Sequence, residues 1–141
     1  MKYLMDTGPL VAFLDANEAP SLRRWASEIL SVLPWPLYTC EAVLTEAAHF
    51  LRTPLPLVEM VEAGEIIIPF TLADQAPDLA RILGGYHGRK VSLADACLVR
   101  MAELWRDSTV VTIDAKDFTV YRRFGREAIQ FISPPRTSLT M

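Results

Sequence analysis

Four acidic residues that lie far apart along the chain are the side chains best suited to chemistry: Asp6, Glu46, Asp95 and Asp114. A fifth acid, Asp117, follows the last of them closely. Each lies where the sequence predicts either a switch from strand to helix or an otherwise apolar helix face. An isolated buried carboxylate is costly, and a divalent cation is the simplest partner for several of them. The acids therefore predict a Mg²⁺-type site of carboxylate and water oxygens, with metal-assisted phosphodiester hydrolysis as its chemistry.

Two of these acids also have an ordinary structural interpretation. Asp6, in Asp6-Thr7-Gly8-Pro9, suits a turn or a helix cap. Asp95 comes three residues after Ser92, where an acid gains roughly 0.3–1 kcal/mol from the helix dipole. Val91 and Leu98 nevertheless flank Asp95 on the same predicted helix face, which favours a carboxylate that points into a pocket.

The other acids differ in how strongly the pattern indicates burial. Glu46 shares its predicted helix face with Val43 and Phe50, which favours a buried side chain over a solvent-facing one. Asp114 and Asp117 fall where a strand turns into a short helix, and either can be the cap of that helix. All of these acids can reach one edge of the predicted sheet, which favours a shared site.

Apolar runs alternate with amphipathic segments along the whole chain. Strands are expected at residues 2–5, 37–40, 66–68, 109–113 and 128–132. Helices are expected at residues 10–14, 21–32, 41–52, 57–63, 72–83 and 93–105, with Ser21 and Ser92 as caps. The β-branched run Ile66-Ile67-Ile68 predicts a strand covered on both faces. The alternation predicts a central parallel β-sheet flanked by helices on both faces, a three-layer α/β/α architecture. Ligands of such sheets bind at the carboxyl ends of the strands, where Asp6 and Asp114 are expected.

Length and composition predict one domain over residues 1–141 without a membrane span or a secretory signal. With 51% hydrophobic and 22% charged residues, the chain has the balance of a soluble globular protein. No apolar run approaches the roughly 20 residues of a membrane span. Cys40 and Cys97 are isolated and are expected to pack in the core, which suits a reducing cytoplasm. The net charge of −3 disfavours a general nucleic-acid binder, unless a metal ion cancels the charge of several acids.

Four short segments, in the same order and spacing, resemble the PIN-domain family. They are Asp6-Thr7-Gly8-Pro9-Leu10, Thr45-Glu46, Ser92-Leu93-Ala94-Asp95-Ala96, and Thr112-Ile113-Asp114 running on to Asp117-Phe118. The resemblance covers essentially the whole chain as a single PIN-like domain. The length and the segment Tyr121-Arg122-Arg123-Phe124-Gly125 look most like the VapC-type toxins of toxin–antitoxin pairs. The resemblance implies a Mg²⁺- or Mn²⁺-dependent endoribonuclease that is usually dimeric and is inhibited by a cognate antitoxin.

The resemblance also assigns roles to individual residues. Asp6, Asp95 and Asp114 are the expected metal ligands, direct or through water, and Glu46 completes the ring of catalytic acids. Thr7, Thr112 and Asp117 are candidates for a second shell that holds these carboxylates in place.

Two features depart from the family pattern. Gly8 stands where the family often has Ser, so one hydroxyl of the pocket is missing. Ala115-Lys116 separates the last two acids, which leaves open whether Asp114 or Asp117 approaches the metal. Asp114 is favoured because it directly follows the predicted strand.

The sequence also predicts binding partners, namely a second copy of the chain and an antitoxin. The apolar stretches with Trp25, Leu30 and Trp35 exceed the needs of one small core, which predicts a homodimer. An antitoxin is expected to place an Arg or Lys near the acids, where it satisfies the carboxylates and excludes RNA. Two basic segments are candidate contacts for RNA phosphates, although such clusters are more often solvated faces: Arg89-Lys90 and Arg122-Arg123-Arg126.

The competing interpretations belong to other classes. An aspartyl-nucleophile phosphohydrolase of the haloacid dehalogenase type needs a second Asp at position 8, where this chain has Gly. A catalytically silent PIN-like module that binds RNA or an assembly partner is the alternative to an enzyme. Acids at all four motif positions favour the enzyme over this alternative.

Overall fold

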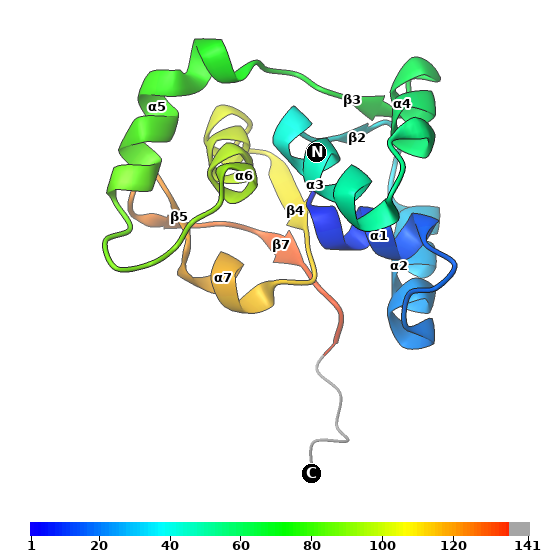
Figure 1. Ribbon diagram of the computed structural model, residues 1–141. Coiled ribbons are helices and arrows are strands. Elements are labelled where there is room, and N and C mark those ends of the chain that lie inside the picture. The colour runs from blue at the N-terminus through cyan, green and yellow to red at the C-terminus, as the bar shows by residue number, and fades with distance from the viewer. Residues whose placement is uncertain (136–141) are drawn as a thin grey trace.

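Strands and helices alternate along the chain as the sequence predicted (Figure 1). The computed structural model describes residues 1–135. The strands are β1 (Lys2–Met5), β2 (Leu37–Tyr38), β3 (Ile66–Ile67), β4 (Ser108–Val111), β5 (Arg122–Arg123), β6 (Glu127–Ala128) and β7 (Phe131–Ile132). The helices are α1 (Thr7–Leu14), α2 (Pro20–Val32), α3 (Glu41–Leu51), α4 (Leu55–Glu62), α5 (Leu72–Gly84), α6 (Leu93–Leu104) and α7 (Ala115–Val120).

A parallel sheet forms the centre of the structure. Within residues 1–135 it has five strands in the order β3-β2-β1-β4-β7. The longest pairing joins β1 and β4, with Leu4 opposite Val110, and every other neighbouring pair in this sheet is also parallel. Strands β5 and β6 instead form a separate antiparallel hairpin. Because β1 and β4 are parallel neighbours, their carboxyl ends lie side by side at the same end of the sheet.

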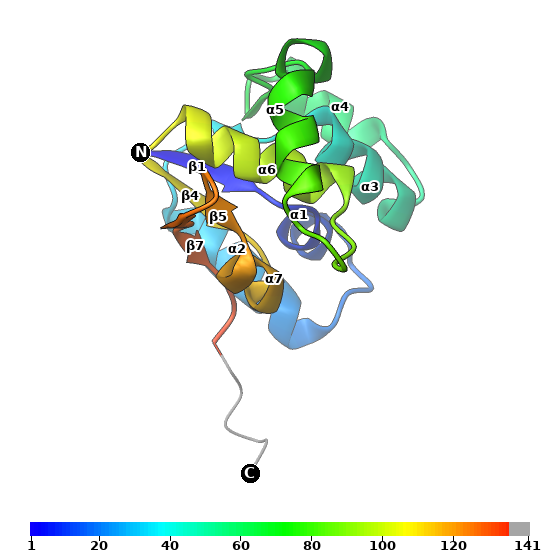
Figure 2. The ribbon, with the colours of Figure 1, turned by 90° about the vertical axis from the view of Figure 1, so that its left-hand side faces the viewer.

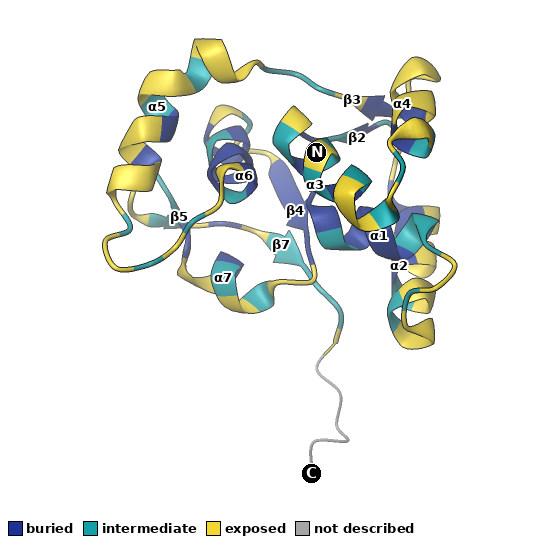
Figure 3. Ribbon diagram, viewed as in Figure 1, coloured by how far each residue is buried: buried dark blue, intermediate teal, exposed yellow. Residues whose placement is uncertain are grey.

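Helices cover both faces of this sheet. Figure 2 shows α3, α5 and α6 on one face and α2 and α7 on the other. The central strands are accordingly buried, and Leu4, Met5, Val110 and Val111 are each 0% exposed (Figure 3). The predicted three-layer α/β/α architecture is therefore confirmed. Among the described residues, no helix is both long and apolar enough to cross a membrane.

Three local expectations were wrong. Ile67 is 38% exposed because β3 is an edge strand, so the run at Ile66 is not covered on both faces. Helix α2 begins at Pro20 and has no side-chain cap, so Ser21 lies inside the helix instead of capping it. The expected strand at 128–132 is divided, because Ala128 pairs with Arg122 in the hairpin and only Phe131 and Ile132 join the main sheet.

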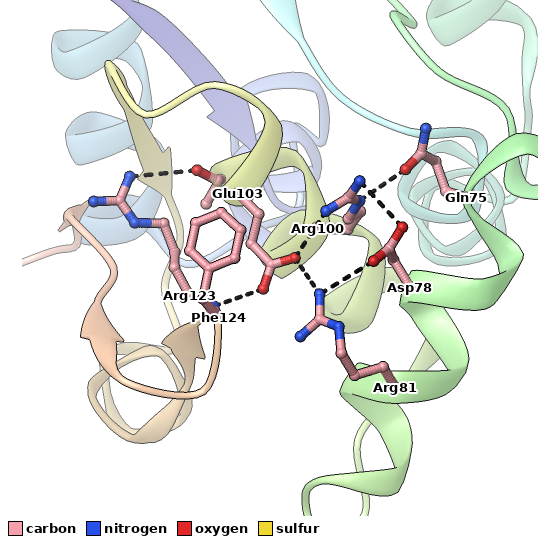
Figure 4. Close-up of polar contacts among 8 residues, drawn as sticks. Gln75, Asp78, Arg81, Arg100, Glu103, Arg123 and Phe124 are labelled. Atoms are coloured by element: carbon pink, nitrogen blue, oxygen red, sulfur yellow. Dashed lines mark hydrogen bonds and ion pairs between the residues drawn. The ribbon is translucent and has the colours of Figure 1, made fainter.

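A buried ionic cluster links α5, α6 and the β5–β6 turn (Figure 4). The side chain of Glu103 is fully buried, and its Oε1 accepts hydrogen bonds from Arg81 at 2.5 Å and Arg100 at 3.1 Å. Its Oε2 accepts the backbone N–H of Phe124 at 2.7 Å. Phe124 has a φ of +53°, so this bond holds a left-handed residue of the turn in place. Both oxygens of one buried carboxylate therefore connect three elements, which the sequence analysis did not foresee.

Candidate active site

An acidic cleft of about 390 Å³ opens at the carboxyl ends of β1 and β4. Its acidic lining residues are Asp6, Glu18, Glu46, Asp95 and Asp114. The structure thus brings the four acids predicted from the sequence to one cleft and adds Glu18, which no sequence motif had indicated. Four of these acids come from different parts of the fold: the end of β1, the middle of α3, the start of α6 and the start of α7.

Asp6 is the most buried of the cleft acids, at 7% exposed. It caps α1, and its Oδ1 accepts the backbone N–H of Thr7 at 2.8 Å. The hydroxyl of the fully buried Thr112 donates to Oδ2 at 2.6 Å. Burial raises the pKa of Asp6, its hydrogen bonds oppose this shift, and the charges of Glu46 and Asp114 add to it. Asp6 therefore both caps α1 and lines the cleft.

Glu46 lies on α3 and is held by the residue that follows Asp6. The Thr7 hydroxyl donates to Glu46 Oε1 at 2.8 Å across the cleft. Glu46 is half-buried, in agreement with its apolar neighbours on the helix, although Phe50 proves to be exposed. Thr7 therefore ties α1 to α3, which fixes the distance between the first two acids.

Asp95 lies in the first turn of α6, where Ser92 accepts its backbone N–H at 3.0 Å. The side chain of Asp95 takes no part in that capping bond. Its Oδ2 instead accepts the phenolic O–H of Tyr121 at 2.7 Å. Partial burial raises the pKa of Asp95 to about 6, and the nearby charge of Asp6 contributes to the rise. Tyr121 is completely buried, and the sequence analysis missed its contact with Asp95. No local pattern could have found that contact, because 26 residues separate the pair.

Asp114 and Asp117 separate into different roles. Asp114 caps α7 and lines the cleft, and it accepts the backbone N–H of Asp117 at 3.3 Å. Asp117 pairs instead with Arg89 at 3.0 Å and does not line the cleft. Asp114 was expected to follow the strand directly. Strand β4 instead ends at Val111, so Asp114 comes three residues after it. The same pairing engages Arg89, which the sequence analysis had treated as a candidate phosphate contact.

The structure gives a physical reason for glycine at position 8. A Cβ atom on Gly8 would lie 2.5 Å from Cγ1 and 2.7 Å from Cδ1 of Ile113. Any side chain at position 8 therefore has to displace Ile113, which lines the cleft and is 43% exposed. The Ile113 side chain thus occupies the space that a side chain at position 8 would need.

The donor set fits a hard divalent cation. Mg²⁺ prefers oxygen ligands and is usually held by one or two carboxylates with several waters. The cleft offers carboxylate oxygens from four elements. Burial raises the pKa of Asp6 and of Asp95, and the charges of neighbouring acids add to both shifts, which a cation would relieve. Within residues 1–135, however, no three His, Cys, Asp or Glu side chains form a compact group of metal ligands. The residues therefore suit an ion that retains water more than one enclosed by protein atoms.

The fold and the cleft define a class of protein. A parallel sheet in the order β3-β2-β1-β4-β7, covered on both faces and with acids at the carboxyl ends of its central strands, is a PIN-like α/β/α fold. No family model matches the chain. Ribonuclease VapC26 of Mycobacterium tuberculosis (strain ATCC 25618 / H37Rv) is 25% identical over 128 residues, which cover 86% of this chain and 93% of that relative. This match confirms the resemblance to VapC-type PIN-domain ribonucleases.

Proposed function

We propose that this protein is a metal-dependent endoribonuclease that hydrolyses RNA phosphodiester bonds, and that it is the toxin of a type II toxin–antitoxin pair. The observation that carries the proposal is that Asp6, Glu46, Asp95 and Asp114 all line one cleft. The similarity to a relative named as a ribonuclease supports RNA as the substrate. An aspartyl phosphohydrolase is disfavoured because position 8 is Gly, packed against Ile113.

In this proposal Asp6, Asp95 and Asp114 hold Mg²⁺ or Mn²⁺, directly or through water. When bound, such an ion supplies positive charge at the scissile phosphate and lowers the pKa of water. Glu46 completes the ring of acids, and its carboxylate orients the attacking water and accepts its proton. Glu46 Oε1 already accepts the Thr7 hydroxyl, so Oε2 is the oxygen assigned to this role.

Three hydroxyl groups orient the acids in the proposed mechanism. Thr112 donates to Asp6, Thr7 to Glu46 and Tyr121 to Asp95, at 2.6, 2.8 and 2.7 Å. Each hydroxyl comes from a different segment of the chain from the acid that it holds. A hydroxyl that donates one hydrogen bond leaves the remaining lone pairs of the carboxylate for a ligand. Thr7, Thr112 and Tyr121 therefore hold the carboxylates in place in this proposal, whereas Asp117 pairs with Arg89.

Metal dependence is tested by calorimetry and by chelation. Titration of the protein with Mg²⁺ or Mn²⁺ is expected to give saturable binding heat without RNA. EDTA is expected to abolish RNA cleavage, and excess Mg²⁺ to restore it, because five acids line the cleft and no Lys or Arg of residues 1–135 does. RNA cleavage that continues undiminished in EDTA would contradict the proposal. RNA binding with neither metal heat nor cleavage would instead support the silent RNA-binding module.

The proposed partners are a second copy of the chain and an antitoxin. Leu30 was expected to contribute to a dimer surface. It is 2% exposed and belongs to the core, so this expectation was wrong. Trp35 is 38% exposed, and Leu55 and Val58 on α4 are each 59% exposed, so other apolar surface is accessible. Five acids in the cleft would also attract an Arg or Lys of an antitoxin.

Light scattering tests both partners in one series. The chain alone, of 15.8 kDa, is expected at twice this mass at micromolar concentration. Addition of a small DNA-binding protein encoded beside this gene is expected to give a larger complex that no longer cleaves RNA. A monomer would remove the dimer from the proposal. A stable complex that still cleaves RNA would show that the partner does not block the active site.

A further inference from the structure

The acidic cleft carries an exposed aromatic ring that hydrolysis itself does not require. Phe50 lines the cleft and is 62% exposed. It lies on α3 one turn after Glu46, a rise of about 6 Å along the helix. A single exposed apolar side chain is ordinary on a protein surface. Phe50 differs because it stands at the cleft in which the carboxylates meet.

The ring is also oriented by a neighbour and joined by other apolar residues. His49 contacts Phe50 edge to face, with ring centroids 5.4 Å apart and an interplanar angle of 71°. Leu22 and Ile113 line the same cleft, and Ile113 is 43% exposed. Apolar side chains therefore line the cleft together with its acids, and one of them carries an exposed flat ring.

The charges of the cleft disfavour the usual contacts between a protein and RNA phosphates. Proteins normally hold nucleic acid through contacts of Lys and Arg with phosphates. Among residues 1–135, no Lys or Arg lines the cleft, whereas five acids do. The side chains that line the cleft therefore offer a phosphate no positive charge, so contacts with the base or sugar become important for binding. Stacking on an aromatic side chain is the contact that every base can make.

We propose that Phe50 is the platform on which a substrate base stacks, so that the cleft accepts RNA as a single strand with an unpaired base beside the scissile phosphate. This inference rests on the proposed ribonuclease function. In a duplex each base face is covered by the neighbouring base, so the ring could not reach it. Phe50 thus selects single-stranded loops or ends over duplex RNA, without choosing among the four bases.

Fluorescence anisotropy with a short fluorescein-labelled RNA of mixed sequence tests the proposal. Ca²⁺ replaces Mg²⁺ so that binding is measured independently of cleavage. F50A is expected to weaken binding of the single strand about tenfold, the scale of one stacked base. F50W is expected to bind at least as tightly as the wild type, and F50L to resemble F50A, because leucine lacks a flat ring. L72A, which removes another half-exposed apolar side chain away from the cleft, is the control and should not change binding.

Changing the RNA completes the experiment. An abasic nucleotide next to the mapped cleavage point should weaken RNA binding by the wild type by about the same factor. It should weaken binding by F50A no further, because both changes remove the same stacking contact. The RNA annealed to its complement should bind more weakly than the single strand. Wild-type affinity in F50A or F50L, or equal affinity for duplex, would overturn the inference. So would an F50A protein that loses only antitoxin binding. The nuclease proposal is judged separately, by cleavage in Mg²⁺ or Mn²⁺.

Discussion

Replacing Asp95 by asparagine is expected to remove nearly all RNA cleavage while leaving the metal-free protein at least as stable as the wild type. In the proposed site Asp95 is a metal ligand, so its loss should lower cleavage by a factor on the order of 10²–10³, as when one preorganised polar group is removed. Asparagine keeps an oxygen that can accept the Tyr121 hydroxyl, so the local structure should persist. Initial rates of RNA cleavage and thermal melting measure the two effects.

The stability effect depends on pH in a defined direction. Burial raises the pKa of Asp95 to about 6 from 3.8, so folding favours the protonated form. The stabilising contribution is fully present below the unfolded pKa and is lost as pH rises through the folded pKa. Above about pH 6 the ionised carboxylate is a cost, which screening by solvent reduces to about 1–2 kcal/mol. D95N should therefore melt higher than the metal-free wild type at pH 7–8, and the difference should disappear near pH 4.

Asp74 provides a matched control for this substitution. Asp74 occupies the same first-turn position in α5, where Thr71 accepts its backbone N–H at 3.3 Å, but it is exposed and outside the cleft. D74N should lose roughly 0.3–1 kcal/mol of helix-dipole stabilisation and no activity. A D95N protein that is less stable than the wild type and still active would show that Asp95 serves only the helix.

Replacing Glu103 by alanine is expected to lower the free energy of unfolding by about 3 kcal/mol, or roughly 10 °C in melting temperature. The reason is that Glu103 is fully buried and accepts from Arg81, Arg100 and the Phe124 backbone. Alanine leaves Arg100, whose side chain is 15% exposed, without one of its two acidic partners, and leaves the Phe124 N–H without its acceptor. Urea denaturation followed by circular dichroism measures the change.

Two further variants identify the cause. E103Q should lose an intermediate amount of stability. Its amide has one oxygen that can accept, but its NH₂ group must face a donor that now bonds to a carboxylate oxygen. E127A is the matched control, since Glu127 also pairs with two arginines but is 29% exposed, and should cost no more than about 1 kcal/mol. Equal losses in E103A and E127A would mean that the buried position of Glu103 carries no extra stability.

Most of the fold followed from local patterns in the sequence. The alternation of apolar runs with amphipathic helices determined the α/β/α layers, because each pattern expresses which face of a segment is buried. The capping of α6 by Ser92 was predicted and confirmed for the same local reason. Boundaries were wrong where a partner decided them, as at β3, whose position at the sheet edge leaves Ile67 exposed.

The candidate acids could be named from the sequence, but their surroundings could not. Motifs and spacing identified Asp114 and Asp117 together, and only the tertiary structure put Asp114 on the cleft and Asp117 against Arg89. The hydrogen bonds from Tyr121 to Asp95 and from Arg81 to Glu103 each join residues more than 20 positions apart. Periodicity reports whether a side chain is buried, whereas the identity of its partner depends on how distant segments pack. For this reason the sequence determined the acids and the layers, and the tertiary structure decided what holds each acid in place.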